Sequence, residues 1–250
     1  MEILKFTLKG RTAFFKMPDV NSYLYFSYGN IHKPALLGLL GAIMGYKGYN
    51  HQEKNNYPEY YEKLKDLKIS IVPNSKMGDF SKKVQIFNNS VGYASSEEGG
   101  NLIVKEYWLE NVSWDIFIKM EDTLLHKDLK ERIINFNFEY TIYLGKNDHL
   151  ADIENVEILE GEKFTEESTK INSLFLRKSI GSSIKENISA FSMKKMNFKN
   201  EYKYEEKLPL TLNPISNQYE TENFIFTNIK YEIINKENFI KIGEKILEFY

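Results

Sequence analysis

The stretch ILKFTLKGRTAFF, residues 3–15, marks the start of the fold because apolar and polar side chains alternate along it. Leu4, Phe6 and Leu8 alternate with polar neighbours, and this period of two is typical of a strand with one buried face. Gly10 interrupts the pattern, so we expect a β-bulge or the close approach of another backbone there. The sequence therefore predicts that the chain opens with a half-buried strand.

The next regular segment is KPALLGLLGAIMGY, residues 33–46. Pro34 suits the first position of a helix, and no polar side chain follows until Lys47, which predicts a helix buried on most sides. The glycines of GLLGAIMG, residues 38–45, each cost a helix about 1 kcal/mol relative to Ala. We expect close packing of the helix on a sheet to compensate.

Further elements are expected as helices at 58–65 and 122–134 and strands at 69–72 and 136–144. Asp122 would cap the later helix, and Phe136 to Leu144 would alternate inward. The order strand, helix, strand, strand, helix, strand over residues 3–144 predicts an α+β fold of the ferredoxin-like, RNA-recognition-motif type.

Two regions depart from this pattern. Residues 76–100 are polar and punctuated by glycine between two strand-like stretches, which indicates either disorder or a projecting hairpin. Beyond residue 150 the chain consists of short β-like pieces separated by Asn, Gly and Pro. We expect domain 1–150 to be followed by a smaller β-rich subdomain, 151–250, whose closing ENFIKIGEKILEFY fits either a short helix or a last strand.

The composition excludes several classes of protein. The 250 residues contain no cysteine, which excludes disulfides, thiolate metal sites and a cysteine nucleophile and fits a reducing compartment. The N-terminus lacks the features of a signal peptide, and the longest apolar run is too short for a membrane span. We therefore expect a cytoplasmic protein. Its net charge of -2 argues against strong nucleic-acid binding by the isolated chain.

Histidines and the helix start are the first candidates for a site. No two of the 4 histidines have metal-ligand spacing, so neither a metal nor a cofactor is expected. His32 and His149 lie in loops at the ends of elements, where ligands often bind. Backbone N–H groups at the start of the helix, with His32 and Lys33 beside them, would form a phosphate pocket.

Two further groups of residues could contact RNA. Lys146, Asn147 and His149 lie in LGKNDH, residues 144–149, which could also be a simple turn. As loop side chains, Lys146 and His149 should be replaceable with little change in melting temperature. Cations also alternate with aromatic residues near the first strand, an arrangement that suits single-stranded RNA but also a solvated outer face; these cations are Lys9, Arg11 and Lys16.

Four stretches together resemble CRISPR-associated protein family five of the type I-B systems. They are KFTLKGRTAFFKMP (5–18), KPALLGLLGAIMGY (33–46), YTIYLGKNDHLADI (140–153) and EEKLPLTLNP (205–214), and the match spans nearly the whole chain. The resemblance implies a RAMP protein, which has an RNA-recognition-motif fold, an inserted β-hairpin thumb and a variable C-terminal part. The thumb would fall at about 76–112.

The resemblance also implies a function. The chain would be a non-catalytic subunit of the Cascade complex that caps the 5′ handle of crRNA. It would contact the large subunit and the neighbouring backbone subunit, and target DNA through the complex. The loop before the glycine-rich helix, with Tyr28, His32 and Lys33, and the LGKNDH loop would approach each other and hold the handle.

A metal-independent RAMP endoribonuclease is the alternative. Such an enzyme needs an acid, a base and a cation around the scissile 2′-OH. Candidates are present in Tyr28, His32, Lys33 and His149, but their spacing does not show that they converge. A type I-C relative cuts precursor crRNA, so the resemblance leaves this alternative open. We expect no catalytic residues.

Overall fold

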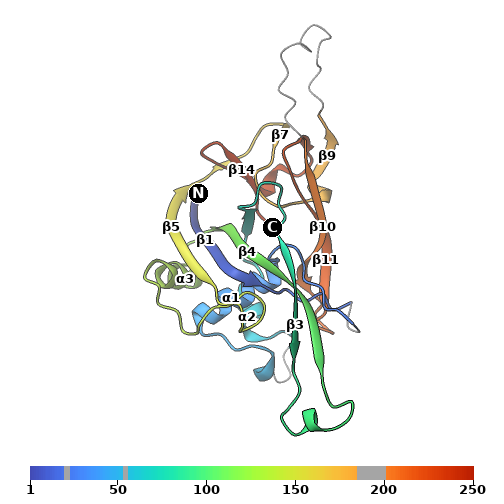
Figure 1. The fold of residues 1–250 in the computed structure, drawn as a ribbon. Coiled ribbons are helices and arrows are strands. Elements are labelled where there is room, and N and C mark those ends of the chain that lie inside the picture. Colours follow the sequence, from blue (N-terminus) through green and yellow to red (C-terminus); the bar gives the residue numbers. More distant parts are fainter. Residues whose placement is uncertain (20–22, 53–55, 185–200) are drawn as a thin grey trace, which may run out of the picture.

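The computed structural model describes residues 1–19, 23–52, 56–184 and 201–250. The fold is α+β with few helices, and all the pairings between its named strands are antiparallel (Figure 1). Among the described residues, no helix combines the length and apolar content needed to cross a membrane.

The first sheet is built around the N-terminal strand. β1 (Glu2–Ala13) pairs with β4 (Ile103–Lys119) on one side and with β5 (Asp152–Glu160) on the other. β2 (Ile69–Pro73) pairs with the far edge of β4, so the strand order is β2-β4-β1-β5. Leu4, Phe6 and Leu8 enter the main core from one face of β1, while on the opposite face Ile3 enters a second apolar cluster and Lys5 and Lys9 remain partly exposed.

Gly10 permits a close approach, one of the two possibilities expected there. A Cβ at this position would lie 2.6 Å from Leu144 Cδ1 and 3.0 Å from the backbone oxygen of Leu150. The irregularity in the pairing of β1 with β5 lies elsewhere, between Lys5 and Thr7.

Helices α1 (Lys33–Met44) and α3 (Leu124–Ile134) contribute to the same core as Leu4 and Phe6 of β1. α1 begins at Lys33 and ends at Met44, and it is capped by Gly45, whose φ of 76° is readily available only to glycine. The cap of α3 is Thr123 rather than Asp122, since the Thr123 hydroxyl accepts a hydrogen bond from the His126 N–H.

The glycines of α1 allow contact with another helix rather than with the sheet. A Cβ on Gly41 would lie 2.5 Å from Tyr60 Cβ in α2 (Glu59–Leu64), and the nearest atom to a Cβ on Gly38 also belongs to Tyr60. The predicted close packing is therefore present, with α2 as the partner.

The strand predicted at 136–144 does not form. α3 ends at Ile134 and is capped by Asn135, and Phe136 follows with a φ of 53° that takes the chain out of an extended path. Phe136 and Tyr140 are exposed instead of alternating inward. β5 pairs with β1 in the place expected of that strand, so the first sheet extends past the domain boundary expected at residue 150.

Beyond β5, the described residues form three small sheets, with strand orders β10-β11-β8, β7-β12-β9 and β14-β13-β6. Their strands are β6 (Glu162–Lys163), β7 (Ser168–Lys170), β8 (Phe175–Leu176), β9 (Ile180–Ser183), β10 (Lys203–Leu212), β11 (Tyr219–Thr227), β12 (Lys230–Ile233), β13 (Phe239–Ile242) and β14 (Lys245–Glu248). Short 3-10 helices lie at Tyr49–His51, Ala94–Ser96, Arg177–Ser179 and Lys236–Asn238. The closing segment is thus a strand hairpin and not a helix.

The polar region after residue 76 forms a projecting hairpin, one of the two alternatives expected from the sequence. β3 (Lys82–Asn88) pairs with the first part of β4, from Ile103 to Leu109. Figure 1 shows this hairpin extending away from the sheets. None of the residues 81–100 is buried, so the hairpin contributes nothing to the core up to that point.

Candidate nucleic-acid interface

A loop segment extends the hairpin at its root. Residues 23–28 run beside β4, where the Tyr25 N–H donates to the Lys105 carbonyl and the Tyr107 N–H donates to the Tyr25 carbonyl, both at 2.9 Å. Tyr25 and Glu106 form a parallel bridge. This backbone pairing sets the aromatic side chains of the loop beside those of β4.

Cations lie over these aromatic rings. The Lys16 ammonium is 4.1 Å from the ring centroid of Tyr25, and the Lys105 ammonium is 4.7 Å from that of Tyr23. Phe26 stacks on Tyr107 with centroids 5.3 Å apart. We call this set the hairpin-root surface; it consists of Lys16, Tyr23, Tyr25, Phe26, Lys105 and Tyr107.

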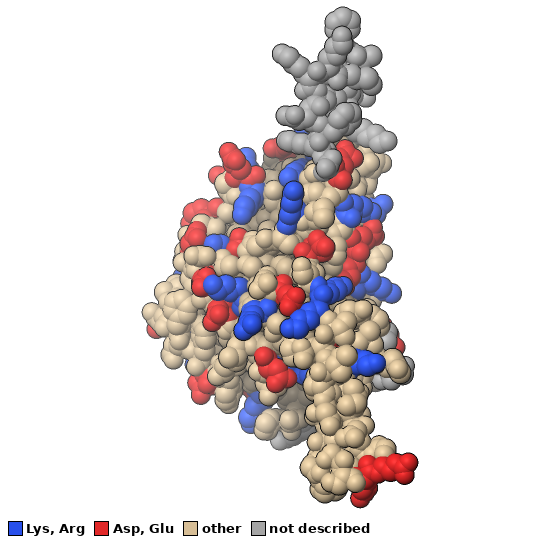
Figure 2. Space-filling model, in the orientation of Figure 1, with Lys and Arg blue, Asp and Glu red and all other residues tan. Residues whose placement is uncertain are grey.

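The hairpin-root surface remains accessible. Tyr23 is 81% exposed and Phe26 is 38% exposed. Within the described parts of the chain, neither Lys16 nor Lys105 forms an ion pair. Figure 2 shows Lys and Arg where the hairpin joins the body, whereas the hairpin tip carries acidic side chains. Exposed rings can stack on bases, at roughly 1–3 kcal/mol per base, while the ammonium groups attract phosphates.

The LGKNDH loop lies against the same hairpin, but its cation is already paired. The Lys146 ammonium is 3.1 Å from both carboxylate oxygens of Glu106. The Glu106 side chain is 6% exposed and also accepts a hydrogen bond of 2.7 Å from the Trp108 indole N–H. Lys146 therefore compensates a buried carboxylate, while Asn147 is exposed in the turn.

His149 is a buried neighbour of that ion pair. Its Nδ1 shares a hydrogen bond of 2.7 Å with the Thr12 hydroxyl, and its ring meets Trp108 edge to face at 4.5 Å. Burial lowers the pKa of His149, and the nearby Lys146 charge lowers it further. His149 is therefore a neutral packing residue near pH 7, not a cation presented to phosphate.

The candidates at the start of α1 are also buried. The His32 Nδ1 accepts a hydrogen bond of 3.3 Å from the Ala35 N–H, and burial lowers the pKa of His32 to about 3. The Lys33 ammonium donates to the Tyr250 carbonyl at 3.2 Å, and burial lowers its pKa to about 8. Tyr28 packs 5.2 Å from His32, and burial raises its pKa to about 12. The side chains of His32 and Lys33 thus do not line an open phosphate pocket.

The loop before α1 and the LGKNDH loop, which were expected to approach each other, lie on different sides of the chain that follows β1. Phe14 contacts Lys146 and His149, with a ring distance of 6.5 Å to His149. Its neighbour Phe15 contacts His32 at 5.9 Å. Adjacent side chains of an extended segment point in opposite directions. The structure therefore brings Lys146 and His149 together, and Tyr28 and His32 together, but does not join the two groups.

The predicted cations along β1 differ in their surroundings. Lys9 forms an ion pair of 2.5 Å with Glu154 of β5. Arg11 is exposed and has no ion-pair partner among the residues that the structure describes. Only Lys16 joins the aromatic surface. Sequence reasoning missed its other members, although the aromatic density of SYLYFSYGNIH, residues 22–32, was a signal for them.

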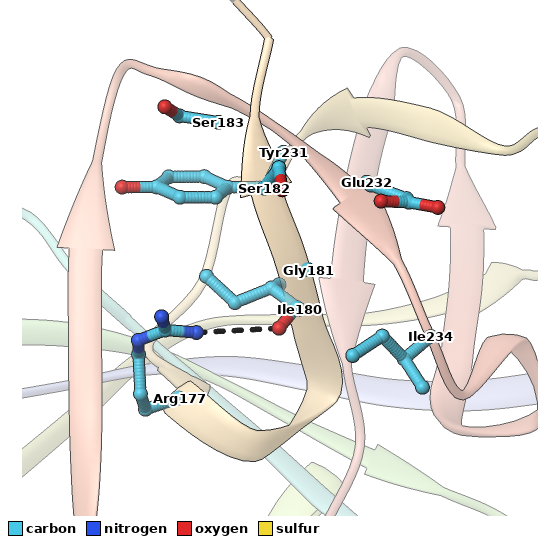
Figure 3. Close-up of a pocket in the computed structure, with 8 residues that line it drawn as sticks. All are labelled: Arg177, Ile180, Gly181, Ser182, Ser183, Tyr231, Glu232 and Ile234. Carbon is cyan, nitrogen blue, oxygen red and sulfur yellow. Dashed lines mark hydrogen bonds between the residues drawn. The ribbon is translucent and has the colours of Figure 1, made fainter.

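A polar hollow of about 740 Å³ lies over β9 and β12. Its Arg177 guanidinium donates to the Ile180 carbonyl at 3.2 Å, and Figure 3 shows Glu232 on the other side of the β9 ribbon. These charged groups do not converge on one point. In the described ranges, no cluster of three or more His, Cys, Asp or Glu side chains could hold a metal ion.

No protein-family model matches this chain, and no curated protein matches it in sequence. Among solved structures, it is similar to a chain of a "CRISPR RNA-guided surveillance complex", with 10% identity, 91% of this chain and 90% of that chain covered, and a TM-score of 0.51. It is also similar to a chain in the cryo-EM structure of the Type III-B Cmr-beta complex bound to cognate target RNA and AMPPnP, with 10% identity, coverage of 93% and 86%, and a TM-score of 0.50. At such identities the likeness is one of fold, and the chain therefore shares its fold with chains of CRISPR RNA-guided complexes.

Proposed function

We propose that this chain is a non-catalytic, cytoplasmic subunit of a type I-B Cascade complex that caps the 5′ handle of crRNA. It would contact the large and backbone subunits, and target DNA through the complex. The observation that carries the proposal is the hairpin-root surface, where Lys16 lies over the half-buried Tyr25 and Lys105 over the exposed Tyr23, and neither lysine forms an ion pair within the described residues. The shared fold and the sequence motifs support the same assignment.

The topology supports a finer description of the fold. In the order β2-β4-β1-β5, α1 and α2 lie between β1 and β2 in the chain, and α3 lies between β4 and β5. This order supports our proposal that the first sheet and its helices form a ferredoxin-like, RNA-recognition-motif domain. We propose that the β3–β4 hairpin is its inserted thumb and that the hairpin-root surface holds RNA at the base of this thumb.

The proposal that the subunit does not cut RNA has support from its histidines. A general acid or base must reach the atom it protonates and titrate near the working pH. His32 and His149 are buried, both have lowered pKa values, and they lie on different sides of residues 14–15.

Co-purification tests the hairpin-root surface. The chain would be expressed with the other Cascade subunits and crRNA, either wild type or with Lys16→Gln and Lys105→Gln. A matched control would carry Lys207→Gln and Lys245→Gln, which are exposed and have no ion pair within the described residues. We expect the first variant alone to lose crRNA in a salt wash, at roughly 1–3 kcal/mol per lost charged contact.

Retention of full-length crRNA by the Lys16 and Lys105 variant, with wild-type salt resistance, would show that this surface does not hold the handle. A second measurement addresses catalysis. The purified chain would be incubated with labelled precursor crRNA in EDTA, and site-specific cleavage that is lost on replacing His32 or His149 would refute the non-catalytic assignment.

A further inference from the structure

A second cationic site lies at the far end of β4 from the hairpin. There, a pocket of about 410 Å³ opens between the first sheet and the closing β13–β14 hairpin. Four lysines and a single carboxylate, Glu237, contribute to its lining; the lysines are Lys68, Lys119, Lys163 and Lys236. Lys119 lies 14 residues further along β4 than Lys105, a separation of about 45 Å at the rise of an extended strand, so this pocket is separate from the hairpin-root surface.

Strand register places two of these lysines directly opposite each other. Ile69 of β2 pairs with Ile118 of β4, so the next residues outward, Lys68 and Lys119, face each other, and the Lys119 N–H donates to the Lys68 carbonyl at 2.9 Å. Like charges in directly opposite positions destabilise a sheet. An anion bound between them would remove that repulsion.

The third lysine reaches the same place from another sheet. Lys163 of β6 pairs with Ile240 of β13, so both side chains lie on one face. Ile240 belongs to an apolar cluster that also contains Phe117 and Phe249. Since Ile240 and Phe249 also line the pocket, its lysines surround the open end of this apolar cluster.

These lysines are not neutralised by nearby carboxylates. Lys5, Lys9 and Lys130 each form an ion pair with a glutamate. Lys68 and Lys119 form none within the described residues, and the same holds for Lys163. Their positive charge is therefore available to a ligand.

We propose that this pocket binds the phosphate group of a nucleotide, either free or within a nucleic-acid strand. Phosphate concentrates negative charge on oxygens that point in several directions, and lysine ammonium groups bind it as point charges. Lysines from β4, from β6 and from the residue before β2 line one pocket and match this geometry, and the volume lies within the range of about 300–1,000 Å³ typical of small-ligand sites. The apolar side chains beneath provide a surface for the remainder of the ligand.

The site can be tested with the isolated full chain by calorimetry at low salt. The probes are inorganic pyrophosphate, ATP and a short single-stranded RNA, with the RNA arm measured in the Lys16→Gln, Lys105→Gln background to exclude the hairpin-root surface. We expect Lys68→Gln with Lys119→Gln to weaken pyrophosphate binding by about 10- to 100-fold. The variant should melt at the wild-type temperature or above it, because a repulsion is removed. Lys76→Gln with Lys207→Gln is the matched control.

The arms separate the sources of the phosphate. Equal affinity for ATP and RNA indicates a free nucleotide, and tighter binding of RNA that pyrophosphate displaces indicates a strand. The proposal is overturned if the Lys68 and Lys119 variant binds pyrophosphate like wild type, or if no probe binds. It is also overturned if polyglutamate displaces RNA to the same extent as pyrophosphate displaces it. None of these results bears on the hairpin-root surface, which the crRNA wash tests separately.

Discussion

Replacing Lys146 with alanine should destabilise the fold, although Lys146 is a loop residue. The substitution removes the cation from Glu106, whose side chain is 6% exposed, and leaves that carboxylate with the Trp108 N–H as its remaining donor. A buried charge that loses its partner keeps the full penalty of desolvation. This differs from the expectation, based on the loop position alone, that Lys146 could be changed without effect on melting.

The size of the effect follows from the geometry of the pair. Losing a hydrogen bond to a charged group costs roughly 1.5–3 kcal/mol. The Lys146 side chain is 33% exposed, so solvent screening reduces the expected loss to about 1–2 kcal/mol. In a chain of this length, each kcal/mol shifts the melting temperature by about 2–4 °C, which predicts a fall of about 2–8 °C.

Urea and thermal denaturation of a double-mutant cycle would measure this. Glu106→Gln removes the buried charge, so adding Lys146→Ala to it should cost about 1 kcal/mol less than Lys146→Ala costs in wild type. Asn147→Ala, in the same turn and exposed, serves as the control. A loss below about 0.5 kcal/mol for Lys146→Ala, or the same loss in both backgrounds, would refute the reasoning.

Three other predictions follow from the fold. Gly41→Ala should lower the free energy of unfolding by roughly 1–3 kcal/mol despite the higher helix propensity of Ala, because the new methyl group would lie 2.5 Å from Tyr60 Cβ. Denaturation curves of this variant are compared with those of Gly48→Ala, the control, whose new methyl group would meet open space. Burial raises the pKa of Glu248 from 4.5 to about 7, so between these values the folded state binds more protons than the unfolded state and stability falls as pH rises. Glu248→Gln should remove this loss of stability with rising pH. The variant should be more stable than wild type by roughly 1–3 kcal/mol at about pH 8 and no more stable near pH 4, which urea titrations at the two pH values would measure. An equal pH dependence of stability in both proteins would contradict the raised pKa of Glu248. Replacing residues 89–101 by an Asn-Gly turn should change the melting temperature by less than about 2 °C, because none of these side chains is buried; a larger fall in a thermal scan would mean that the hairpin tip supports the core.

The elements that sequence reasoning found are those with strong local signals. The alternation in residues 3–8 and the Pro34 start of α1 led to the correct strand and helix. The expected strand at 136–144 failed because the positive φ of Phe136 is not encoded by a Gly or Asn at that position. The alternation there was real, but it could not outweigh the turn that ends α3.

The candidate site was harder to predict because charge compensation and burial depend on distant residues. Lys9 is neutralised by Glu154 and Lys146 by Glu106, and neither carboxylate is near its partner in the sequence. His32 is enclosed partly by Tyr219, which approaches from β11. Loop position correctly indicated that these side chains lie at the ends of elements, but it could not indicate which of them face solvent.

The central position of β1 has a consequence for synthesis of the chain. Both of its partners lie far downstream, at Leu109–Lys119 and Asp152–Glu160, so β1 cannot complete its ladders until residue 160 has left the ribosome. At translation rates of about 5–20 residues per second, this interval is roughly 8–30 s. During that time Leu4, Phe6 and Leu8 belong to a nascent strand with two unpaired edges, a species prone to aggregate. A reduced growth temperature, which slows aggregation, should therefore improve the yield of folded protein, and so should a chaperone that binds the first 15 residues. Both should improve it more than substitutions in the C-terminal sheets.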